Sequence, residues 1–203
     1  MATVFNEYKD YKTAAQRHLM TCQYMVECLT LPDNTLHKPL SSSYKSYLLK
    51  NIYYLSGYTI ESIINYAIYE CVNESKPRHR KIRFVNELCE PSQRLIFTLD
   101  TRKTPRAVGD RTRYLYVIAF HNFKENYKVL NNLATSSKFA GIPVISRTHY
   151  PIYWRSIQPL FDNWEAQVRY KNDILTLYTE QQILDFFKFS SELYTSIRSC
   201  ITT

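Results

Sequence analysis

The chain has 203 residues, a net charge of +8 and only three glycines. A chain of this length suits one domain with its own hydrophobic core, so it needs neither a disulfide nor a bound metal to fold. Because hairpins and glycine-rich phosphate loops consume glycine, the composition favours helices and argues against folds that depend on such loops.

The five cysteines show no zinc-ligand spacing, either with one another or with histidine. They are expected to be reduced thiols used for packing, and no metal or other cofactor is expected. The chain has no apolar stretch of about 18 residues, and from its first residues we expect no secretory leader. The sequence therefore predicts a protein that does not cross a membrane and that is located in the cytoplasm.

The first predicted helix runs from about Val4 to Leu29. Its apolar positions are separated alternately by four and three residues, which is typical of a helix packed lengthwise on another. His18 lies in this apolar seam. We interpret it as a histidine at the edge of the core, hydrogen-bonded to a neighbour, because no second ligand lies near it in the sequence. The apolar seams of the first two helices also favour a stable dimer.

A long second helix is predicted to begin after the capping serines Ser41–Ser43 and to end at about Asn73. Gly57 lies in its middle, where glycine costs about 1 kcal/mol relative to alanine. The expected compensation is the close approach of another helix.

From residue 75 to residue 110 the helical pattern breaks. The third helix is predicted from about Arg111 to Leu133, and residues 134–159, which contain three prolines, are expected to be irregular. A short element centred on Trp164 follows. The last helix is predicted from about Thr179 to Cys200, with Thr179 and Gln182 as a capping box. The chain is thus predicted to form an all-α fold in one domain spanning 1–203, with insertions at about 75–110 and 134–159.

The irregular stretch contains a basic and aromatic cluster formed by 147–150, Trp154 and Arg155. This cluster has two interpretations. It is either a surface that stacks bases and binds phosphates, or a loop packed by its own aromatic side chains. The second interpretation is favoured.

The positive charge is concentrated in one segment. Residues 76–113 include eleven basic and four acidic residues, so this segment alone carries +7, and such a field attracts polyanions. Its most basic run, 77–83, either binds phosphates or forms a solvated loop that contacts an acidic partner protein. Arg169, near the last helix, is expected either to brace the bundle or to contact a ligand. The candidate nucleic-acid-binding residues are Lys76, Arg78, Arg80, Lys81, Arg83, Arg111, Arg113 and Arg169.

Three stretches, in this order, resemble the HEPN family (higher eukaryotes and prokaryotes nucleotide-binding). The stretch Tyr53–Glu61, YYLSGYTIE, is similar to the family's central helix motif. His121-Asn122-Phe123 resembles a His-Asp-Leu stretch at a helix start. Trp164 followed by Val168-Arg169-Tyr170 resembles an Arg-Tyr element before the final helix.

The resemblance implies a four-helix up-and-down bundle that forms a homodimer and belongs to a bacterial conflict, toxin-antitoxin or phage-defence system. The implied partners are RNA, a nucleotide, or a protein such as a nucleotidyltransferase. Ribonuclease members of the family carry an Arg and a His that are separated by four to six intervening residues on one helix, and no such pair occurs here. We therefore expect a non-catalytic binding module. The alternative is a metal-independent ribonuclease with an atypical site at Arg113 and His121.

Overall fold

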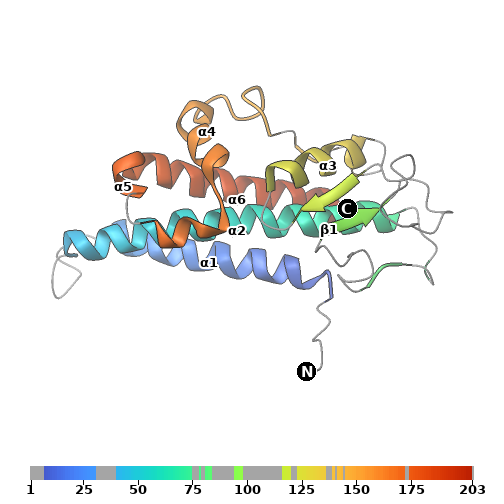
Figure 1. The fold of residues 1–203 in the computed structure, drawn as a ribbon, viewed down its shortest axis with the longest axis horizontal. Coiled ribbons are helices and arrows are strands. Elements are labelled where there is room, and N and C mark those ends of the chain that lie inside the picture. Colours follow the sequence, from blue (N-terminus) through green and yellow to red (C-terminus); the bar gives the residue numbers. More distant parts are fainter. Residues whose placement is uncertain are drawn as a thin grey trace. The chain divides into compact units, whose positions relative to one another are not determined.

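A computed structural model describes residues 7–30, 40–74, 78, 81–83, 94–97, 116–119, 123–135, 139, 141–143, 145–171 and 174–202. Of residues 94–97, 116–119, 135, 169 and 202 it describes the backbone alone. Helices predominate among these residues, as expected, and they are accompanied by one pair of short strands (Figure 1). None of the helices in the described ranges combines the length and the apolar composition that a membrane crossing needs.

The elements follow one another in a simple order. They are α1 (Asp10–Thr30), α2 (Ser42–Glu74), β1 (Arg94–Phe97), β2 (Tyr116–Ala119), α3 (Phe123–Thr135), α4 (Trp154–Asn163), the 3-10 helix η3 (Ala166–Tyr170), α5 (Ile174–Leu177) and α6 (Glu180–Thr202).

The described residues divide into two compact units. Unit 1 combines the described parts of Met1–Thr13, Glu61–Ile142 and Ser196–Thr203, and unit 2 combines Ala14–Ile60 with Pro143–Thr195. The division passes through α1, α2 and α6, so each of these helices contributes residues to both units. The prediction of a single domain stays a prediction.

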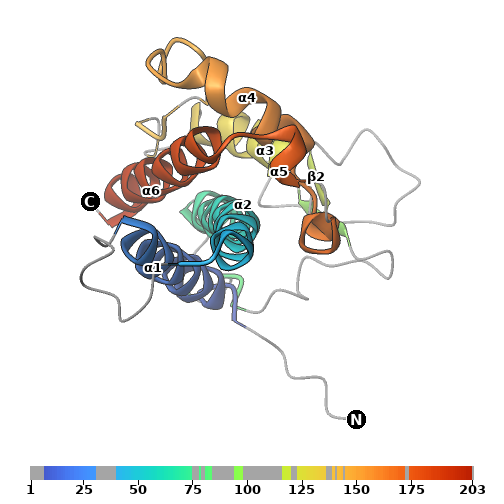
Figure 2. The same ribbon diagram turned by 90° about the vertical axis from the view of Figure 1, so that its left-hand side faces the viewer.

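In unit 2, parts of α1, α2 and α6 lie side by side (Figure 2). The Cys22 thiol donates to the Ile52 carbonyl oxygen, with sulfur and oxygen 3.7 Å apart. The predicted seam of α1 is confirmed here, because Ala15 and Cys22 are both fully buried. Since this seam packs inside the chain, it no longer argues for a dimer.

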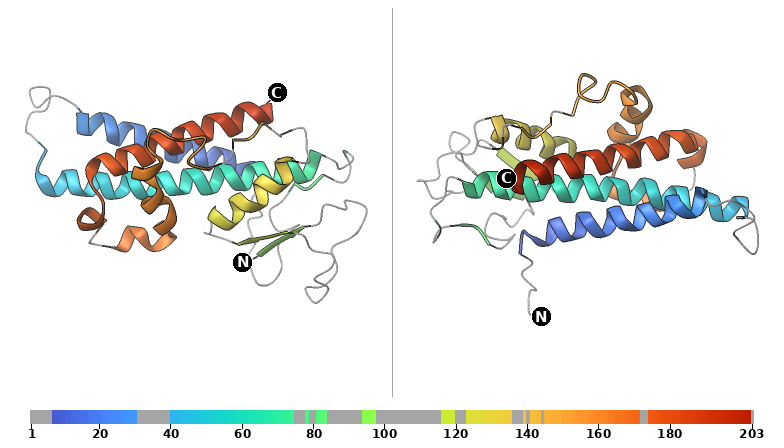
Figure 3. Two further views of the ribbon diagram at one scale, coloured as in Figure 1. Left: turned by 90° about the horizontal axis from the view of Figure 1, so that it is seen from above. Right: turned by 180° about the vertical axis from the view of Figure 1, so that it is seen from behind.

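In unit 1, β1 and β2 form an antiparallel pair in which Arg94 is opposite Ala119, and α3 lies against β2 (Figure 3). The Asn126 amide of α3 donates to Asn65 Oδ1 of α2 at 3.0 Å, and both side chains are buried. This bond satisfies two buried polar groups that would otherwise destabilise the core.

The start of the predicted third helix is wrong, because residues 116–119 form a strand and α3 begins only at Phe123. The run Tyr116-Val117-Ile118-Ala119 is continuously apolar and rich in aromatic and β-branched residues, which a strand accommodates well. Residues 116–119 form a strand rather than a helix because they pair with residues 94–97 of β1, which are distant in the sequence.

Two further boundaries differ from the prediction. The first helix begins at Asp10, because Glu7 and Tyr8 form a bridge and a turn before it. Helix α4 begins at Trp154, inside the stretch expected to be irregular, and includes Pro159. A proline inside a helix removes one backbone hydrogen bond, and the burial of Ile157, Leu160 and Phe161 offsets that loss.

The predicted caps of α2 and α6 are confirmed. Ser41 Oγ accepts the backbone N–H of Tyr44 at 3.3 Å. Thr179 Oγ1 accepts the N–H of Gln182 at 3.2 Å, while Gln182 Oε1 accepts the N–H of Thr179 at 2.9 Å. Both bonds of the predicted capping box are therefore formed.

Gly57 makes room for the indole ring of Trp164. A methyl group at Gly57 would overlap the five-membered ring of this indole, and the same indole makes an edge-to-face contact with the Tyr58 ring at 5.2 Å. A close neighbour was expected at Gly57, but it is this side chain rather than another helix. Trp164 is only 5% exposed.

We predict that Gly57→Ala destabilises the protein. Overpacking costs about 1–3 kcal/mol, and the better helix propensity of alanine offsets about 1 kcal/mol of it. Because the overlap with the indole ring is deep, the free energy of unfolding should fall by about 1–2 kcal/mol. Urea unfolding followed by tryptophan fluorescence measures this loss. Gly141→Ala is the control, because its methyl group would meet Cys200 Sγ at an ordinary 3.5 Å. A Gly57→Ala protein as stable as the wild type would contradict the contact.

Candidate functional site

Three consecutive residues of the predicted basic region, Lys81–Arg83, form what we call the anchored segment. Ile82 is buried, whereas Lys81 and Arg83 on either side of it are exposed. Ile82 is the only apolar aliphatic residue between Lys76 and Arg83. Its burial between two exposed basic side chains therefore fixes which side chains of the anchored segment remain in solvent.

Asn73, near the end of α2, binds both backbone polar groups of Ile82. The Ile82 N–H donates to Asn73 Oδ1 at 2.8 Å, and Asn73 Nδ2 donates to the Ile82 carbonyl oxygen at 2.9 Å. Asn73 is 3% exposed, so water does not compete for these two bonds. The amide group thus acts as a neighbouring strand would and holds the segment extended.

A second anchor comes from the residues just before α1. The backbone N–H of Tyr8 donates to the Arg83 carbonyl oxygen at 3.1 Å. Tyr8 is itself fixed, because its hydroxyl donates to Glu70 Oε1 of α2 at 3.0 Å and its ring stacks on Tyr69 at 5.2 Å. Two adjacent residues of the basic segment are therefore bonded to residues that belong to the core of unit 1.

The charges on this surface differ in how far they are neutralised. Arg83 pairs with Glu7, with Nη2 and Oε1 2.7 Å apart, and the Arg83 side chain is 70% exposed. Arg78 and Lys81 are exposed and pair with no carboxylate among the described residues. Their positive charge is therefore available to an anionic ligand.

The other predicted site residues are not described in full. Of Arg169 only the backbone, in η3, is described, so its contacts stay a prediction. The remaining candidates lie outside the described residues, and this includes both residues of the alternative ribonuclease site. They are Lys76, Arg80, Arg111, Arg113 and His121.

Tyr150, in the loop preceding α4, packs into the core of unit 2, which is in line with the favoured interpretation that the aromatic residues here serve packing. Tyr150 is 8% exposed and makes an edge-to-face contact with the ring of Phe189 at 4.9 Å. The Trp154 ring lies 6.2 Å from that of Phe161. Both rings therefore contribute to packing within unit 2.

His18 lies at the edge of the core, as expected. Its ring lies 5.7 Å from that of Tyr58, and partial burial lowers its pKa below the ordinary range. Among the residues that the structure describes, His18 makes this ring contact in place of the expected hydrogen bond. Within the described ranges, no cluster of three or more His, Cys, Asp or Glu side chains suits a metal ion.

Sequence reasoning missed the residues that anchor the segment, namely Glu7, Tyr8 and Asn73. No sequence pattern identifies the hydrogen-bond partner of a single buried asparagine at a helix end. The isolated Ile82 within a charged run was the one available signal, because a single apolar residue in such a run suggests a point of attachment.

We predict that Asn73→Ala lowers the free energy of unfolding by about 1–3 kcal/mol, because both backbone groups of Ile82 lose a buried partner. Asn51→Ala is the matched control, since Asn51 makes an exposed bond to the Tyr47 carbonyl oxygen within its own helix. Chemical unfolding of both variants tests the difference. Equal stability of the two variants would show that the amide of Asn73 does not anchor the segment.

A second prediction concerns alkaline pH. Burial, and then Glu70, raises the pKa of Tyr8 to about 12 from 10.0. The folded state therefore retains a proton that the unfolded state loses, so Tyr8 contributes stability that is lost as the pH rises from about 10 through about 12.

The free energy of unfolding of Tyr8→Phe, measured between about pH 8 and pH 11, should fall less steeply than that of the wild type. Tyr24→Phe is the control, because Tyr24 is 64% exposed. A wild-type slope in Tyr8→Phe would contradict the role given to Tyr8.

Comparison with protein-family models, curated proteins and solved structures finds no match to this chain. No relative therefore bears on the HEPN resemblance, which stays an expectation based on the residues that carry it.

Proposed function

We propose that this chain is a non-catalytic binding module that holds single-stranded RNA on the anchored segment and Arg78. The observation that carries the proposal is the double hydrogen bond between Asn73 and Ile82, which keeps Lys81 and Arg83 exposed on either side of a buried residue. An ordinary solvated loop would need no such attachment.

The spacing of the cations supports a phosphate ligand. In an extended segment, residues two apart point to the same side and lie about 6.6 Å from each other. Lys81 and Arg83 are therefore close enough to contact neighbouring phosphates of one strand. The pair between Arg83 and Glu7 is exposed, and such pairs contribute about 0–1 kcal/mol, so a phosphate can displace the carboxylate at little cost.

The helices support a HEPN-like four-helix up-and-down bundle as part of the same proposal. In unit 2, Cys22 contacts Ile52 and His18 contacts Tyr58, so α1 runs antiparallel to α2. Lys45 pairs with Glu180 and Tyr53 packs on Phe186, so α6 runs parallel to α2. The first, second and last helices of an up-and-down bundle have these directions.

Two of the stretches that carry the resemblance also meet, since Trp164 packs on Gly57. The start of α3 at Phe123 agrees with the helix start that the resemblance implies. A homodimer, a partner such as a nucleotidyltransferase, and a role in a bacterial conflict system belong to this proposal. In this proposal the chain differs from a simple four-helix bundle by its long basic insertion at about 75–110.

The proposal is tested by the salt dependence of RNA binding. In fluorescence anisotropy with a single-stranded RNA, affinity should fall with rising salt, and removing two phosphate contacts should lower the slope of log K against log salt by about 1.4. We expect this change in Arg78→Ser/Lys81→Ser. With EDTA present throughout, the RNA should be recovered intact.

The matched control is Lys45→Ser/Lys128→Ser, which removes the same charge from lysines that pair with Glu180 and Glu125. It should leave the slope close to that of the wild type. Equal slopes for the two double variants would mean that net charge, and not this surface, attracts the RNA. If the wild-type protein does not bind RNA at about 50 mM salt, the proposal is wrong.

A further inference from the structure

Unit 2 contains a pocket of about 600 Å³ between α2, the end of α4, η3 and α5. Pockets that bind small ligands have volumes of about 300–1,000 Å³. Its inner wall is formed by side chains that are nearly fully buried, and its rim by charged side chains that are exposed. The wall includes Tyr53, Trp164, Val168 and Ile174, and the rim includes Asp162, Glu165 and Lys171.

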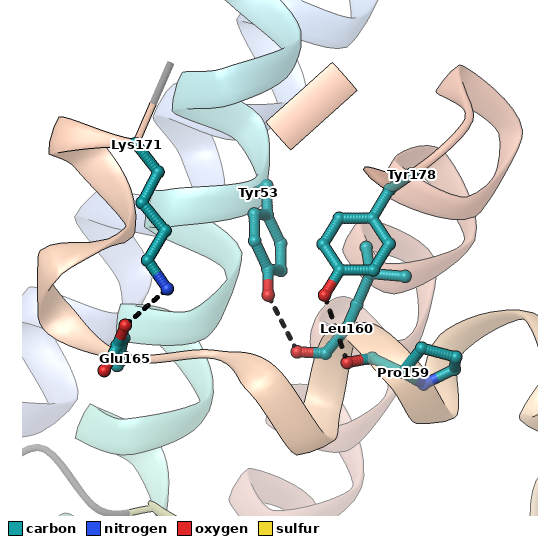
Figure 4. A network of polar contacts seen from close by, with 6 residues as sticks. All are labelled: Tyr53, Pro159, Leu160, Glu165, Lys171 and Tyr178. Carbon is teal, nitrogen blue, oxygen red and sulfur yellow. Dashed lines mark hydrogen bonds and ion pairs between the residues drawn. The ribbon is translucent and has the colours of Figure 1, made fainter. Parts of the chain in front are cut away.

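The tyrosine hydroxyl groups at the pocket are engaged with α4. Tyr53 donates to the Leu160 carbonyl oxygen at 2.9 Å, and Tyr178 donates to that of Pro159 at 3.5 Å (Figure 4). These contacts leave the rings, rather than hydroxyl protons, to face a ligand. Burial, with smaller contributions from Tyr178 and Glu165, holds the pKa of Tyr53 far above its ordinary range, so the ring is neutral.

The rim carries two carboxylates against one ammonium group, although the chain as a whole is strongly basic. The Lys171 ammonium pairs with Glu165 at the edge of the pocket (Figure 4), and these side chains are 44% and 50% exposed. Exposed pairs of this kind contribute about 0–1 kcal/mol. An incoming cation can therefore replace Lys171 on Glu165.

We propose that this pocket binds an organic cation, whose ammonium or guanidinium group takes the place of Lys171 on Glu165 while its apolar part lies against Tyr53 and Trp164. The aromatic wall suits the apolar part of such a ligand, while the carboxylates of the rim attract its cationic group and select against phosphates. The pocket and the anchored segment therefore have opposite ligand preferences, and neither proposal depends on the other.

The test compares benzylamine with benzyl alcohol, which has the same skeleton without the charge. Binding is followed by the fluorescence of Trp164 in Trp154→Phe, since the chain has two tryptophans. Benzylamine should change the emission saturably and benzyl alcohol much less. A blocked peptide with one arginine is the second probe. If the peptide binds more tightly, the natural ligand is an arginine side chain of a partner protein. If benzylamine binds more tightly, the natural ligand is a small organic amine.

Variants of the rim give changes of opposite sign. Glu165→Gln and Asp162→Asn should each weaken benzylamine binding about two- to fivefold, whereas Lys171→Met should strengthen it by a similar factor, because the competing ammonium group is gone. Damage to the fold would weaken binding in all three. Lys45→Gln, in the same unit, is the control and should change nothing.

Three results would overturn the proposal. They are benzyl alcohol binding as tightly as benzylamine, weaker binding by Lys171→Met in a folded protein, and no response to either cation.

Discussion

Helix α2 is buried along most of its length. The hydrogen bonds that attach α3, Ile82 and α4 to this helix depend on that burial. Residues 59–69 are all buried, so the polar groups among them need partners inside the protein. Two buried asparagines of this helix find such partners in neighbouring segments of unit 1 and thereby fix them. Asn65 binds Asn126 of α3, and Asn73 binds Ile82. In unit 2 the same helix contributes the hydroxyl of Tyr53, which binds a carbonyl oxygen near the end of α4. Each of these side chains holds a different part of the chain against α2.

Local signals in the sequence predicted the long helices well. The capping serines of α2 and the capping box before α6 act over three residues, and the structure confirms both. The strand pair was missed, because its formation depends on the pairing of residues 94–97 with 116–119, more than twenty positions away. Helix α4 was missed because a helix with an internal proline is stabilised by burial against other elements rather than by its own propensity.

The candidate site was predictable in its charge and not in its geometry. Counting residues located the basic region, and the structure shows Arg78 and Lys81 exposed there. The sequence could not show that Arg83 is paired with Glu7, because the two are far apart in the chain. The aromatic pocket was likewise hidden, since its walls come from four elements. The result is a strongly basic chain whose pocket rim has the opposite sign from its basic surface.

The proposed function requires that RNA is held on the anchored segment. Amide chemical-shift mapping of isotope-labelled protein, titrated with a short single-stranded RNA at low salt, tests it most directly. We expect the largest shifts among the described residues at Arg78 and Lys81–Arg83, together with Asn73, whose side chain binds Ile82. Shifts confined to the pocket or to the loop before α4, with none at the anchored segment, would contradict it.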